Sequence, residues 1–71
     1  MSLAKIWKRR IEAGTQRLDK CPNNIVDEVI SLIREDIQKS EYTTEELHSL
    51  VDDGKLSEDD YNYIIEGVVI A

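Results

Sequence analysis

Cross-linking and aromatic residues are scarce in this chain of 71 residues. It contains one cysteine, one proline, one tryptophan, one histidine and no phenylalanine. A single cysteine excludes an intramolecular disulfide, and small secreted domains usually depend on such cross-links for stability. We therefore expect a cytoplasmic protein.

Long apolar runs are also missing. No segment approaches the roughly 20 consecutive apolar residues that cross a bilayer. Charged residues interrupt the N-terminal region in which a signal peptide would lie. We therefore expect no membrane contact.

Acidic residues are abundant, and they give the chain a net charge of −6. The charge is uneven, because residues 1–20 have a balance of +4 and residues 21–71 a balance of −10. Two interpretations follow: the two halves attract each other inside one fold, or the basic segment meets nucleic acid or an acidic partner.

Apolar residues recur with helical spacing in four segments, 3–13, 23–39, 43–54 and 57–67. The longest segment carries one apolar stripe made of Val26, Val29, Ile30, Ile33 and Ile37. Asn23 or Asn24, Thr43 and Ser57 are expected to cap the N-termini of the last three helices. Glycines 14, 54 and 67 follow the first, third and fourth segments, where helices commonly end.

This pattern predicts a single all-α domain over residues 1–71. We expect a small bundle of three to four helices whose last two form a C-terminal helical hairpin. The predicted core consists of Ile6, Trp7, Ile11, Leu18, Val26, Val29, Ile30, Ile33, Leu47, Leu50, Leu56, Tyr61, Ile64 and Ile65.

Motifs that carry chemistry are weak. Gly54 stands where a calcium-binding EF-hand loop has its glycine, but Val51 then occupies a position that requires an oxygen ligand. Cys21 and His48 could form a nucleophilic pair, yet nothing local supports it, and we expect a partly buried connector cysteine and an exposed helix histidine. We predict no enzyme activity and no catalytic, cofactor-binding or metal-binding residue.

The segment from Tyr42 to Gly67 resembles small helical proteins of phages and conjugative transposons. It reads YTTEEL, then VDDGKLSEDDY, then Ile64. The succession of aromatic-Thr, acidic helix, Gly, aliphatic, Ser, acids and Tyr is similar to the XkdX-like phage proteins. SHOCT-type oligomerisation domains share the helix–Gly–helix core. The resemblance implies an accessory protein of a mobile genetic element, with no catalytic residues to carry over.

Our first functional hypothesis is a non-enzymatic adaptor that binds a protein partner or itself. Its candidate contacts are apolar residues that we expect to be exposed, namely Tyr42, Tyr63, Val68, Val69 and Ile70. The alternative is a nucleic-acid-binding accessory factor that uses the basic N-terminal segment, with Lys5, Lys8, Arg9, Arg10 and Arg17.

Overall fold

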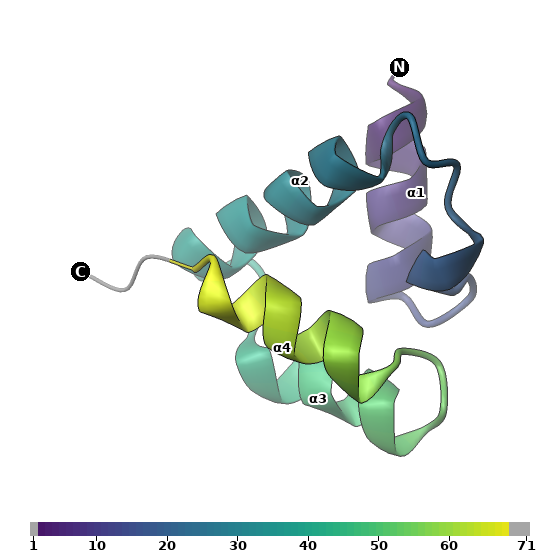
Figure 1. The fold of residues 1–71 in the computed structure, drawn as a ribbon. Helices are drawn as coiled ribbons and strands as arrows, with labels where there is room; N and C mark the ends of the chain where they lie inside the picture. Colours follow the sequence, from purple (N-terminus) through teal and green to yellow (C-terminus); the bar gives the residue numbers. More distant parts are fainter. Residues whose placement is uncertain (1, 69–71) are drawn as a thin grey trace.

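The computed structural model describes residues 2–68. Over these residues the fold consists of four α-helices and one short 3₁₀ helix (Figure 1). In chain order the elements are α1 (Leu3–Glu12), η1 (Leu18–Lys20), α2 (Val26–Gln38), α3 (Thr44–Asp52) and α4 (Glu58–Glu66). Residues 2–68 contain no strand, so the prediction of a small all-α bundle is confirmed.

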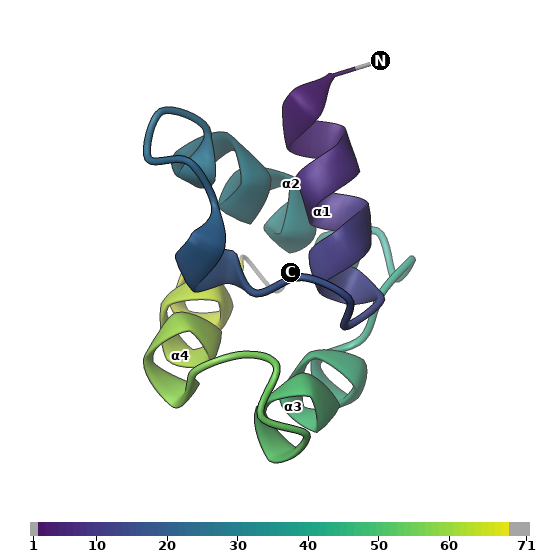
Figure 2. The ribbon, with the colours of Figure 1, turned by 90° about the vertical axis from the view of Figure 1, so that its right-hand side faces the viewer.

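Helix α2 lies at the centre of the packing. It contacts both α1 and α4, and α4 in turn contacts α3. Figures 1 and 2 show α3 and α4 at the same end of the molecule, below α1 and α2. Val29, Ile30 and Ile33 of the α2 stripe are buried. Burying each such side chain stabilises the fold by roughly 1.5–3 kcal/mol.

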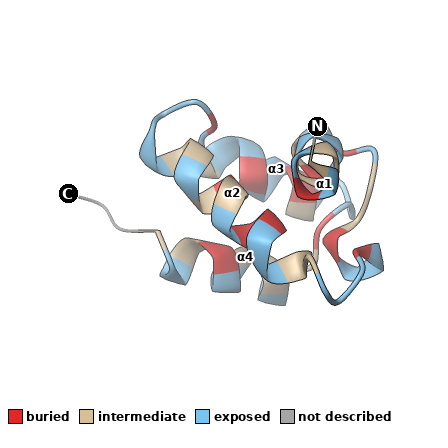
Figure 3. Cartoon of the chain, turned by 90° about the horizontal axis from the view of Figure 1, so that it is seen from above, coloured by how far each residue is buried: buried red, intermediate tan, exposed pale blue. Residues whose placement is uncertain are grey.

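Figure 3 shows both buried and exposed positions along α2 and α4. None of the helices has both the length and the apolar character that crossing a bilayer requires within the described part of the chain.

Two of the predicted N-terminal caps form. The Thr43 hydroxyl accepts a hydrogen bond from the Glu46 backbone N–H at 3.0 Å, and the Ser57 hydroxyl accepts one from the Asp60 N–H at 3.1 Å. Each bond satisfies a backbone donor that the first helical turn leaves unpaired.

The predicted asparagine cap of α2 is wrong. The helix begins at Val26, and its cap residue, Ile25, makes no side-chain hydrogen bond. Ile25 instead donates its N–H to the Pro22 carbonyl at 3.1 Å, which closes a turn before the helix. Both asparagines lie in that turn, too early to reach the free N–H groups of α2.

The connections α2–α3 and α3–α4 have the same backbone design. The second residue of each connection is in the left-handed region, Ser40 with φ 63° and Gly54 with φ 75°. The next residue, Glu41 or Lys55, donates its N–H back into the preceding helix. This is the Schellman ending, which satisfies carbonyls left free at a helix C-terminus.

The two connections also share a buried side chain. Tyr42 and Leu56 each precede a capping residue, Thr43 or Ser57, and each is buried. We predicted that Tyr42 is exposed, and this is wrong: only 7% of its surface is accessible. The dipeptides Tyr42-Thr43 and Leu56-Ser57 stand 14 residues apart, and in each an apolar side chain directly precedes a capping hydroxyl residue. This shared position is the sequence signal for the burial of Tyr42.

The remaining core agrees in part with the sequence prediction. Nine predicted members are buried, namely Ile11, Leu18, Val29, Ile30, Ile33, Leu47, Leu50, Leu56 and Ile64. The other five, Ile6, Trp7, Val26, Tyr61 and Ile65, are only half-buried. Four of these five still pack against the buried cluster, namely Trp7, Val26, Tyr61 and Ile65. Ala4 and Cys21 are buried although the prediction left them out of the core.

Replacing Leu47 with alanine tests the assigned core. Leu47 is fully buried, so we expect the free energy of unfolding to fall by about 2–5 kcal/mol. Urea unfolding followed by circular dichroism measures it. The matched control is Leu3→Ala, at a position that is 54% exposed, where we expect a change within about 0.5 kcal/mol. Equal effects of the two substitutions would contradict the core assignment.

Candidate functional site

The five basic residues predicted for nucleic-acid binding do not form one free surface. Lys5, Arg9 and Arg10 are exposed on α1. Lys8 points to α2, where its ammonium lies 2.9 Å from the Asp36 carboxylate. The Arg17 guanidinium forms an ion pair with Asp19 at 3.0 Å. Three of the five side chains are therefore available to contact nucleic acid, because the charges of Lys8 and Arg17 are partly neutralised by these ion pairs.

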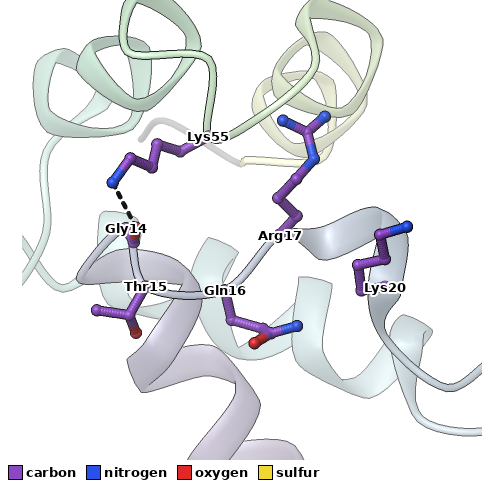
Figure 4. A pocket seen from close by; sticks show the side chains of 6 residues that line it. All are labelled: Gly14, Thr15, Gln16, Arg17, Lys20 and Lys55. Carbon is purple, nitrogen blue, oxygen red and sulfur yellow. Dashed lines mark hydrogen bonds between the residues drawn. The ribbon is translucent and has the colours of Figure 1, made fainter.

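A pocket of about 350 Å³ lies beside the end of α1 (Figure 4). Three of its six lining residues are basic, Arg17, Lys20 and Lys55. Lys55 reaches across from the α3–α4 connection and donates to the Gly14 carbonyl at 3.0 Å. Arg17 donates to the Gly54 carbonyl. Both side chains thus join the segment after α1 to the α3–α4 connection, and the pocket combines positive charge with a structural contact.

Two carboxyl groups meet where α1, α2 and α3 come together. The Glu12 side chain, at the end of α1, lies within hydrogen-bonding reach of the Asp36 side chain of α2. Lys8 pairs with Asp36, and the buried Tyr42 hydroxyl donates to the Glu12 backbone carbonyl at 3.2 Å. We call these four residues the Glu12 cluster.

The protonation states within the Glu12 cluster follow from its geometry. Burial, the hydrogen bond to Asp36 and the Asp36 charge raise the pKa of Glu12 to about 8. Burial acts to raise the pKa of Asp36 as well, but hydrogen bonds from Glu12 and Lys8 outweigh it and leave that pKa below 3.8. Glu12 Oε2 is buried and has no hydrogen-bond partner among the described residues. A proton on Glu12 would give this carboxyl group a donor that Asp36 can accept.

Tyr63 is the exposed aromatic residue that the sequence predicted, with 53% of its surface accessible. The Arg34 guanidinium of α2 lies over its ring at 4.8 Å from the ring centre. The same guanidinium donates to the backbone carbonyls of Ile64, at 3.1 Å, and Tyr63, at 2.6 Å. Arg34 therefore covers the C-terminal end of α4, where the helix dipole favours a cation, and it fixes one face of the tyrosine ring.

The other predicted apolar contacts lie around the chain end. Val68 is half-buried and its N–H donates to the Ile65 carbonyl at 3.1 Å. Val69 and Ile70 lie outside the described residues. Of the five candidates, Tyr63 alone combines a described position with strong exposure.

Cys21 and His48 occupy different environments. Cys21 belongs to the buried cluster, and burial raises the pKa of its thiol, which disfavours the nucleophilic thiolate. His48 is exposed, as predicted, and its ring meets the Tyr61 ring edge-on at a centroid distance of 5.2 Å. His48 and Tyr61 also line a second pocket, of about 280 Å³, with Thr44 and Glu45.

The loop that resembles part of an EF-hand is a connection between helices. Gly54 ends α3 in the left-handed conformation and Ser57 caps α4, as we predicted from the positions of these residues in the sequence. No group of three or more histidine, cysteine or acidic residues in positions 2–68 has a spacing that could hold a metal ion.

Comparison of the chain with protein-family models, with curated proteins and with solved structures finds no match in any of the three. Function must therefore be argued from the geometry of the chain itself.

Sequence reasoning missed several side chains that organise these sites. Arg34 was not singled out, because an isolated arginine beside an apolar stripe does not indicate which group its guanidinium will contact. Lys20 and Lys55 join Arg17 at one pocket only after the chain folds. The partners Glu12 and Asp36 are 24 residues apart, and no local spacing rule links them.

Alanine at position 67 tests the contact between Arg34 and α4. A Cβ atom on Gly67 would overlap the Arg34 guanidinium, so that group would have to leave the helix end. Gly67 has a φ of −90°, where Gly→Ala ordinarily stabilises a protein by about 0.4–1 kcal/mol. We expect this gain only in an Arg34→Ala background. Urea unfolding of the wild type, both single variants and the double variant measures the coupling, and equal effects in both backgrounds would contradict the contact.

Proposed function

We propose that the protein is a non-enzymatic interaction module that binds a protein partner, or a second copy of itself, through the end of α4 around Tyr63. The observation that carries the proposal is the exposed Tyr63 ring held under Arg34. Tyrosine and arginine are enriched among the residues that dominate binding energy in protein interfaces.

Preorganisation supports the role of Tyr63. Arg34 is already immobilised by two backbone carbonyls of α4, so the ring and guanidinium lose little freedom when a partner covers them. Binding free energy is then not spent on ordering these side chains. Val68 is half-buried and lies two residues beyond the end of α4, where it extends the apolar contact.

The resemblance over residues 42–67 supplies the biological setting of this proposal, a phage or a conjugative transposon. The structure gives four residues of that segment a physical role: Thr43 and Ser57 cap helices, Gly54 ends α3, and Leu56 fills the core. The similarity therefore supports a shared hairpin architecture. Genes for tail assembly or DNA transfer on either side of the coding sequence would support the setting.

Truncation of Tyr63 to alanine tests the interaction proposal. If Tyr63 is a main contact, its loss should cost about 2 kcal/mol of binding, which corresponds to roughly 30-fold weaker affinity. Sedimentation equilibrium over a wide concentration range measures self-association. Capture from the source cells, followed by titration of the purified captured protein, measures binding to another protein.

The matched control for this experiment is Asn62→Ala, at the adjacent exposed position of α4. It should leave affinity unchanged. If the wild type neither self-associates nor binds a captured protein, or if both variants bind alike, the proposal is wrong.

A nucleic-acid-binding function is the second candidate, and the distribution of positive charge favours it. Lys5, Arg9 and Arg10 are exposed on α1, and the pocket with Arg17, Lys20 and Lys55 lies beside the end of that helix. Ammonium and guanidinium groups so placed could contact successive phosphates. The net charge of −6 opposes such binding, and salt would weaken it further.

Titration with duplex DNA at two salt concentrations distinguishes the two candidates. If the basic face binds DNA, the logarithm of the affinity should fall with that of salt, with a slope of about 0.9 per phosphate contact. Replacing Lys5 and Arg9 with glutamine should reduce the slope by about two contacts. Lys39→Gln is the control, because Lys39 already pairs with Glu35 at 2.6 Å. Absence of binding at low salt would exclude this candidate.

A further inference from the structure

The Glu12 cluster contains an arrangement that neither functional candidate uses. Asp36 pairs with the Lys8 ammonium at 2.9 Å, and the neighbouring Glu12 carboxyl has a buried oxygen, Oε2, with no hydrogen-bond partner among the described residues. We propose that Glu12 and Asp36 form a proton-operated latch, in which one shared proton holds the end of α1 against α2 and α3, and loss of that proton releases it.

Charge balance explains why the latch is closed when the proton is bound. Protonated Glu12, ionised Asp36 and ionised Lys8 sum to zero, so no unpaired charge lies in this half-buried place. Asp36 accepts from both neighbours, and its side chain is only 14% exposed. Loss of the proton leaves two carboxylates in contact with a single cation, and burying an unpaired charge is costly.

Every helix that meets at the cluster contributes charge to it. Besides Lys8, helix α1 contributes Arg9, whose positive charge repels that of Lys8. Lys39, the residue that caps the end of α2, has a positive charge that stabilises ionised Asp36. Helix α3 brings Glu46, which repels an ionised Glu12. Glu46 therefore adds to the force that separates α1 from α3 once the proton leaves.

The Tyr42 phenol stays protonated throughout this transition, since burial and the charges of Glu12 and Glu46 raise its pKa to about 12. Its hydroxyl continues to donate to the Glu12 carbonyl. Ionisation of Glu12 is therefore the event that changes the cluster in neutral and mildly alkaline solution.

The direction of the pH effect follows from linkage between proton binding and folding. The pKa of Glu12 rises from 4.5 to about 8 when the chain folds. Stability from this group is therefore complete below pH 4.5 and is lost as the pH rises through about 8. The low pKa of Asp36 acts only on the acid side, below about 3.8.

Release of the latch would open a defined part of the core. The end of α1 packs on α3, because an added Cβ at Gly14 would lie 3.2 Å from Leu50 Cδ2. Lys55 also bonds to the Gly14 carbonyl. Moving this end would expose apolar surface around Ile11, Leu50 and Tyr42, all of which are buried in the closed form, and it would reshape the basic pocket.

Glu12→Gln is the direct test, because the amide keeps the shape and the donor of the protonated carboxyl and cannot ionise. Between pH 6 and pH 9 we expect the urea midpoint of the wild type to fall and that of Glu12→Gln to stay constant. Amide exchange at Ala13 and Gly14, corrected for intrinsic base catalysis, should accelerate in the wild type alone. Glu28→Gln, at an exposed position of α2, should behave as the wild type does.

A carbon-13 titration of the wild-type Glu12 carboxyl needs no variant and so covers the case in which Glu12→Gln does not fold. The latch requires that this carboxyl titrate well above the exposed glutamates. A Glu12 midpoint equal to theirs, or parallel pH dependence of the wild type and Glu12→Gln, would overturn the proposal.

Discussion

Two oppositely charged side chains near the end of α2 attach the neighbouring helices to it. Arg34 donates to the carbonyls at the end of α4, and Asp36, two residues later, accepts from Lys8 and Glu12 of α1. The apolar stripe of α2 brings the helices together, but an apolar surface has no preferred rotation. The two polar attachments specify how each helix end lies, and both candidate surfaces depend on them.

The two attachments differ in how they respond to conditions. Arg34 is held by hydrogen bonds to two uncharged backbone carbonyls of α4. The attachment of α1 depends on a proton that is lost near pH 8. One helix end is thus fixed and the other is adjustable, although both are held by the same short stretch of α2.

Local signals in the sequence were sufficient for most of the fold. Thr43, Ser57 and Gly54 act through residues a few positions away, so their caps and turns could be predicted. Tyr42 was misplaced because tyrosine is often exposed. Its burial depends on a turn in which Ser40, and not glycine, takes the left-handed conformation. The Glu12–Asp36 and Arg34–Tyr63 contacts depend on how helices cross, which no spacing rule supplied.

Amide hydrogen exchange of the whole chain at neutral pH tests the central role of α2 most directly. If the other helices depend on it, the amides of Val29, Ile30 and Ile33 should exchange only through global unfolding and should be the slowest in the protein. Amides of α1 and α4 should then be no better protected than these. Faster exchange in the middle of α2 than in α1 or α4 would contradict the account.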